Sequence, residues 1–83
     1  MNRVTLDVRT LEHPKPLEYG IEALKSLDDH SYIYMLNRKN PIPLIRLAQE
    51  HGFQTLSHEA SEQEWHILIS KNKELPLKEY LDV

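Results

Sequence analysis

The sequence predicts a two-layer α/β sandwich of the α+β type, in which two helices cover one face of a mixed four-stranded sheet. Segments with strand-like alternation and segments with helical spacing follow one another in the order β-α-β-α-β-β. Strand–helix–strand units favour parallel pairing with right-handed crossovers. The last two strands are close enough along the chain to form a hairpin, which makes the expected sheet mixed.

The first strand and the first helix are predicted over residues 4–8 and about 14–27. Apolar and polar side chains alternate from Val4 to Val8, as in a strand with one buried face. Pro14 and Pro16 suit the first turn of a helix. Four apolar residues then follow at helical spacing, and the polar residues 28–31 end the helix. These four are Leu17, Ile21, Leu24 and Leu27.

The second strand and the second helix follow the same scheme. Residues 32–36 are apolar on both faces, which indicates an interior strand. Residues 37–43 contain two prolines and predict a loop, and apolar residues from Leu44 to Ala48 predict a helix. Gly52 suits the left-handed position that closes a helix.

The final hairpin combines strands at 53–59 and 65–70 through a polar connection at 60–63. In the last strand, Trp65, Ile67 and Ile69 alternate with His66, Leu68 and Ser70. Because Trp65 belongs to this alternating set, we expect it to anchor the sheet. We expect one domain over residues 1–71 and a C-terminal tail over 72–83. Two interpretations of the tail remain open: one amphipathic helical turn after Pro76, or a solvated segment.

Composition excludes several classes of function. The net charge of −3 and the isoelectric point of about 5.9 argue against nucleic-acid binding. The apolar runs are too short for a membrane span, and the N-terminus lacks a signal-peptide pattern, so we expect a cytoplasmic protein. No cysteine is present, so the chain cannot carry a thiol or persulfide. We expect a monomer or a weak homodimer.

The five histidines do not predict a metal centre. No pair has the spacing of a familiar metal motif. His58 and His66 would face one another across the hairpin, but two histidines alone make an incomplete site. We therefore expect no metal and no cofactor.

Residues 6–16 read Leu-Asp-Val-Arg-Thr-Leu-Glu-His-Pro-Lys-Pro. This segment resembles the opening of the TusA/SirA-like sulfur carriers, in which a strand with Leu-Asp precedes Cys-Pro-x-Pro at the start of the first helix. The resemblance implies the same fold over most of the chain. However, His13 stands in place of the sulfur-bearing cysteine, and an imidazole cannot form a persulfide.

The chain is most similar to a branch of that family without the cysteine, described only as a domain of unknown function. Members of this branch often show Asp-x-Arg early and Asn…Pro-x-Pro-Leu later. The matching segments here are 7–9, and Asn37 followed by 41–44.

The candidate site lies where the first two strands pass into helices, because loops at the carboxyl ends of parallel strands open at one edge of a sheet. Its basic side chains could form one rim that binds a partner protein or a small anionic ligand. The candidate residues are Asp7, Arg9, His13, Pro14, Lys15, Pro16, Asn37, Arg38 and Lys39.

Structural explanations remain open for the same residues. Proline is common at helix starts, and surface lysine and arginine are ordinarily solvated. Asp7 could simply hold Arg9, or Arg9 could pair with Glu12.

No catalytic set is evident, so a non-catalytic binding module is the leading interpretation. The alternative is a component of redox or sulfur metabolism in which His13 acts as acid, base or ligand. A third interpretation is association through the open sheet face or the tail.

Overall fold

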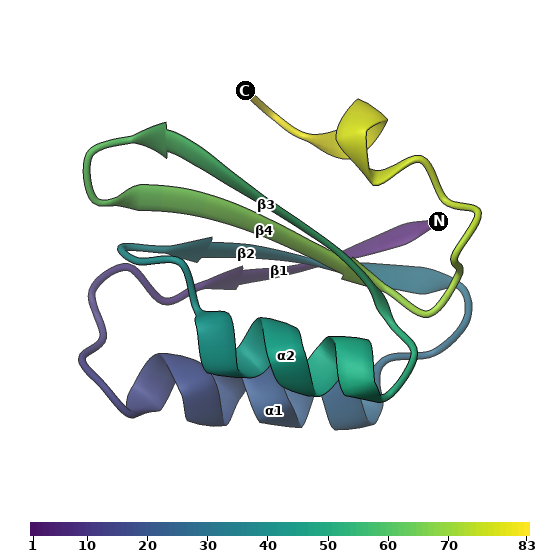
Figure 1. The fold of residues 1–83 in the computed structure, drawn as a ribbon, viewed down its shortest axis with the longest axis horizontal. Coiled ribbons are helices and arrows are strands. Elements are labelled where there is room, and N and C mark those ends of the chain that lie inside the picture. Colours follow the sequence, from purple (N-terminus) through teal and green to yellow (C-terminus); the bar gives the residue numbers. More distant parts are fainter.

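The computed structural model describes residues 1–83 and confirms the predicted fold (Figure 1). The sheet has the order β1-β2-β4-β3, in which β1 and β2 are parallel and the other neighbours are antiparallel. The elements are β1 (Asn2–Asp7), α1 (Lys15–Ser26), β2 (Ser31–Asn37), α2 (Ile42–Glu50), β3 (Gln54–Ser61), β4 (Glu64–Ser70) and the 3₁₀ turn η1 (Leu77–Tyr80).

The main core lies between the sheet and the two helices, which both cover the same sheet face (Figure 1). The central strand β2 contributes Ile33 and Met35 to this layer, and β4 contributes Ile67 and Ile69. Both strands have a neighbour on each side, so their apolar side chains are almost completely enclosed. Trp65 packs against this core as a partly buried side chain, as expected of a sheet anchor.

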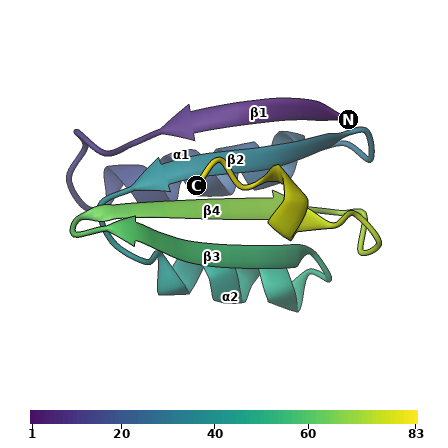
Figure 2. The same cartoon turned by 90° about the horizontal axis from the view of Figure 1, so that it is seen from above.

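The C-terminal tail covers part of the other sheet face. Figure 2 shows residues after β4 turning back over β2 and β4. Leu75 and Leu77 of the tail are 7% and 3% exposed, and they form a second apolar cluster with Tyr32, Tyr34 and Leu68 of the sheet. This face of the sheet is therefore not open to solvent over its centre.

The first strand differs from the prediction. Val4 was expected to be buried, but 41% of its surface is exposed, because β1 is an edge strand with a neighbour on one side only. Val8 lies beyond the end of β1, yet it is 1% exposed and belongs to the main core. The buried end of the predicted strand is thus Val8, at the start of the β1–α1 loop.

Two glycines shape the helix layer. At Gly20 of α1, an added Cβ would lie 2.5 Å from Leu44 Cδ2 of α2, so the absence of a side chain permits the close approach of the helices. Gly52 has φ = 82° and follows His51, the residue that caps α2, as predicted for a left-handed helix end. Helix α2 begins at Ile42, two residues earlier than the apolar pattern predicted. No helix has the length and apolar character needed to cross a bilayer.

Candidate ligand-binding site

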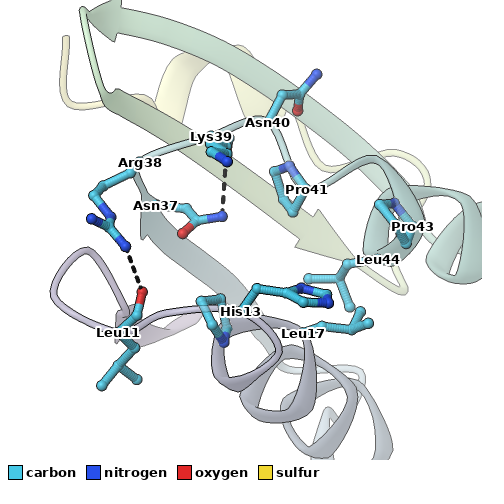
Figure 3. A pocket seen from close by; sticks show the side chains of 11 residues that line it. Leu11, His13, Leu17, Asn37, Arg38, Lys39, Asn40, Pro41, Pro43 and Leu44 are labelled. Atoms are coloured by element: carbon cyan, nitrogen blue, oxygen red, sulfur yellow. Dashed lines mark hydrogen bonds between the residues drawn. The ribbon is translucent and has the colours of Figure 1, made fainter.

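A surface pocket lies between the β1–α1 loop and the β2–α2 loop. Because β1 and β2 are parallel, both loops leave the same edge of the sheet, and each leads into the first turn of a helix. We call this feature the inter-loop pocket; its volume is ≈ 240 Å³. Figure 3 shows its two sides, with His13 and Leu17 on the α1 side and Arg38 and Lys39 on the β2–α2 loop. Its lining residues are Leu11, His13, Pro16, Leu17, Asn37, Arg38, Lys39, Asn40, Pro41, Pro43 and Leu44.

The structure brings five of the nine candidate residues together at this pocket: His13, Pro16, Asn37, Arg38 and Lys39. His13 is exposed and precedes Pro14, to which it is joined by a cis peptide bond. Arg38 donates from a guanidinium nitrogen to the Leu11 carbonyl at 3.0 Å, which ties the two loops together.

The remaining four candidates lie outside the pocket: Asp7, Arg9, Pro14 and Lys15. Lys15 points to Glu18, with Nζ 3.7 Å from the carboxylate. Arg9 and Lys15 of the predicted basic rim thus each lie beside an acidic side chain, and only His13, Arg38 and Lys39 of its five members line the pocket.

Arg9 is held by two carboxylates. Its Nε and one terminal nitrogen donate to the two oxygens of Asp7 at 2.9 and 2.8 Å, and its other terminal nitrogen donates to Glu64 at 3.2 Å. The hydrogen bonds from Arg9 hold the pKa of Asp7 below its usual range and raise the pKa of Arg9 itself. Of the two open interpretations, the pairing with Asp7 is observed and a pairing with Glu12 is not.

Free backbone donors also lie at the inter-loop pocket. Proline occupies the second position of both helices, at Pro16 and Pro43, and supplies no N–H. The next residues, Leu17 and Leu44, line the pocket, and their main-chain N–H groups donate to no acceptor in the chain. Unpaired N–H groups in a first helical turn favour a negative ligand.

The electrostatic character of the pocket is positive. His13, Arg38 and Lys39 line it, whereas none of its lining residues is acidic. The whole chain, by contrast, has 13 acidic and 10 basic residues. The inter-loop pocket thus concentrates positive charge on a protein of net negative charge.

Comparison with known protein families assigns the chain. A family model described as "Uncharacterized conserved protein (DUF2249)" matches residues 5–71. The chain belongs to the DUF2249 family. The matched residues include both loops of the inter-loop pocket but not the tail. Neither the curated proteins nor the solved structures contained a match. A relation of this DUF2249 domain to the TusA/SirA-like sulfur carriers stays a prediction.

The candidate residues named from the sequence omitted part of the pocket wall of this DUF2249 domain. Asn40, Pro41, Pro43 and Leu44 come from the second loop and the start of α2. Their proximity to Arg38 and Lys39 along the chain was an available signal. Leu11 and Leu17 lie equally close to His13 and Pro16 along the chain, but helical spacing assigned Leu17 only to the core.

No metal centre is formed by the side chains. No group of three or more histidine and acidic residues lies close enough to hold an ion. His58 and His66 do pair across the hairpin, as predicted. However, both ring nitrogens of His66 already have partners, Tyr34 and Glu64, so the ring is not free to bind a metal.

The sequence did not reveal a polar network beneath the tail. His66 is 5% exposed, and its two ring nitrogens contact the Tyr34 hydroxyl and Glu64, the latter at 3.0 Å. The Tyr34 hydroxyl accepts a hydrogen bond from the Asp82 main-chain N–H at 2.9 Å. All groups are satisfied if the hydroxyl donates to His66 Nδ1 and His66 Nε2–H donates to Glu64. With Arg9 on the other oxygen of Glu64, the network extends from the β1–α1 loop to the tail.

Proposed function

We propose that this DUF2249 domain is a non-catalytic binding module that recognises a small anionic molecule in the inter-loop pocket. One observation carries the proposal: three basic side chains, and no acidic one, line a pocket in a protein of net charge −3. A field of one sign in a concave site attracts ligands of the opposite sign.

The size of the inter-loop pocket supports a small ligand. A volume of ≈ 240 Å³ corresponds to about eight water molecules at their share of the liquid. Sites for drug-sized molecules are larger, roughly 300–1,000 Å³. An acidic surface of a partner protein, the other occupant expected from the sequence, would have to insert a single carboxylate side chain into this space.

The basic groups have distinct roles in the proposal. Arg38 uses one terminal nitrogen on the Leu11 carbonyl, which holds the guanidinium at the pocket while its other N–H groups stay available. Lys39 has no ion pair within the chain and can turn toward a ligand. His13 supplies a ring nitrogen from the opposite loop, where the sulfur carriers that the sequence resembles have their cysteine.

The test is a titration of the ¹⁵N-labelled domain with succinate and with phosphate, followed through backbone amide shifts. We expect the amides of Leu17 and Leu44 to move first. The variant Arg38→Gln/Lys39→Gln should weaken binding strongly, since it removes two charges at similar side-chain length.

The matched control is Lys73→Gln/Lys78→Gln, which makes the same change in net charge at exposed lysines that line no pocket. Binding that weakens equally in both variants reflects net charge alone and contradicts the proposal. So does the absence of any shift at the pocket.

A further inference from the structure

Asn37 places a hydrogen-bond acceptor at the inter-loop pocket. It is the last residue of β2, on the same side of the strand as Ile33 and Met35, and only 8% of it is exposed. Its Nδ2 donates to the Lys39 carbonyl at 3.0 Å. A carbonyl can only accept, so this bond fixes which end of the amide faces the loop backbone.

The amide oxygen of Asn37 is left without a partner. No group of the chain donates to it, and Figure 3 shows it turned away from the Lys39 carbonyl. It is not sealed from solvent, unlike the oxygen of Asn40, which is fully buried and also unpaired. A nearly buried acceptor is costly unless water or a ligand donates to it. A ligand in the inter-loop pocket can reach the Asn37 oxygen.

A bare anion does not suit this acceptor. A carboxylate or sulfate offers only oxygens, and these would meet the Asn37 oxygen as like partial charges. Arg38 and Lys39 directly follow Asn37 in the sequence. A ligand that satisfies all three residues therefore needs a hydrogen-bond donor for Asn37 and a negative charge for the two basic side chains.

We propose that the ligand is a small carboxylate that also carries an N–H or O–H donor, as in an acylated amino acid or an amido acid. The donor bonds to the Asn37 oxygen, and the carboxylate lies at Arg38 and Lys39. This inference rests on the proposed function and adds the chemical class of the ligand.

The experiment compares two anions that differ in one group. N-acetylglycinate and acetoxyacetate have the same charge and nearly the same shape, but the first has N–H where the second has an ester oxygen. We expect the amide to bind about tenfold more tightly, the worth of one hydrogen bond. In Asn37→Ala the preference should fall to about onefold, because the amide loses more affinity than the ester.

Asn2→Ala is the matched control, because it removes an exposed asparagine outside the inter-loop pocket, and it should keep the preference. Asn37→Leu, with a side chain of the same branched shape and no polar atom, repeats the test if Asn37→Ala shows a disturbed amide spectrum. Equal binding of both anions to the wild type overturns the requirement for a donor and leaves the anion pocket standing. If neither anion shifts the pocket amides, both proposals fail.

Discussion

The docked tail offers the sharpest test of the structure outside the pocket. Leu77 in η1 is 3% exposed and packs with Tyr32, Tyr34 and Leu68. Leu77→Ala removes three buried carbons, worth about 2.4 kcal/mol of transfer free energy. The cavity left behind raises the expected loss of unfolding free energy to about 3 kcal/mol. A domain of this length has a free energy of unfolding of roughly 4–12 kcal/mol, so this loss is a large fraction of its stability.

The assay is thermal and urea unfolding followed by circular dichroism. A loss of about 3 kcal/mol lowers Tm by roughly 12–24 °C in a domain of this size. Lys78→Ala, in the same turn but exposed, is the control and should change the unfolding free energy by less than about 0.5 kcal/mol. The cost of Leu77→Ala cannot exceed the free energy with which the tail docks. If the two variants unfold alike, the tail does not contribute to the fold as the structure shows.

Two further predictions concern helix packing and pH. Gly20→Ala would gain about 1 kcal/mol from helix propensity, but its Cβ would overlap the buried Leu44 side chain, which costs about 1–3 kcal/mol. We expect Gly20→Ala to lower the free energy of unfolding measured in urea, and to raise it in a Leu44→Ala background, where the space is open. A higher free energy of unfolding in the wild-type background would contradict the packing. Asp82 accepts a hydrogen bond from Arg3 at 2.7 Å, which lowers the pKa of the carboxyl from its ordinary 3.8. The contribution of the Asp82–Arg3 pair to stability is thus present above pH 3.8 and is lost as the pH falls through the lower pKa of the folded state. Wild type should be more stable than Asp82→Asn at neutral pH, and this difference in unfolding free energy should shrink as the pH falls below 3.8; a difference independent of pH would refute the ion pair.

The fold could be predicted because its periodicities are local. The interior strand at Tyr32–Leu36 is apolar on both faces, and the residues from Trp65 to Ser70 alternate, so each indicated its burial without knowledge of its neighbours. The predicted burial of Val4 was wrong, because the position of a strand at the edge of a sheet depends on strand order, which the alternation of side chains does not encode. The tail had two open interpretations because its few apolar residues are buried only against a sheet face formed by distant strands.

The site was predicted in outline and not in detail. Parallel topology brought the two loops together, as expected from the order of strands and helices. Asp7 pairs with Arg9, as the sequence allowed, but the second carboxylate on Arg9 belongs to Glu64, which is 55 residues away along the chain. Sequence proximity therefore identified the basic residues of the loops and the local partner of Arg9, but not the partner that only the pairing of β4 brings near.

The polar network also decides how the competing surface, the tail, has to be tested. Removal of residues 72–83 would uncover Tyr34 and Leu68 and remove the Asp82 N–H from the Tyr34 hydroxyl. The same hydroxyl contacts His66, which contacts Glu64, which contacts Arg9 in the β1–α1 loop. A truncated domain that fails to bind would thus have lost both the tail and a support of the loop. Substitution of Lys39 leaves both this network and the bond from Arg38 to the Leu11 carbonyl intact, because its side chain takes part in neither, so Lys39→Gln alone is the change that locates the binding surface.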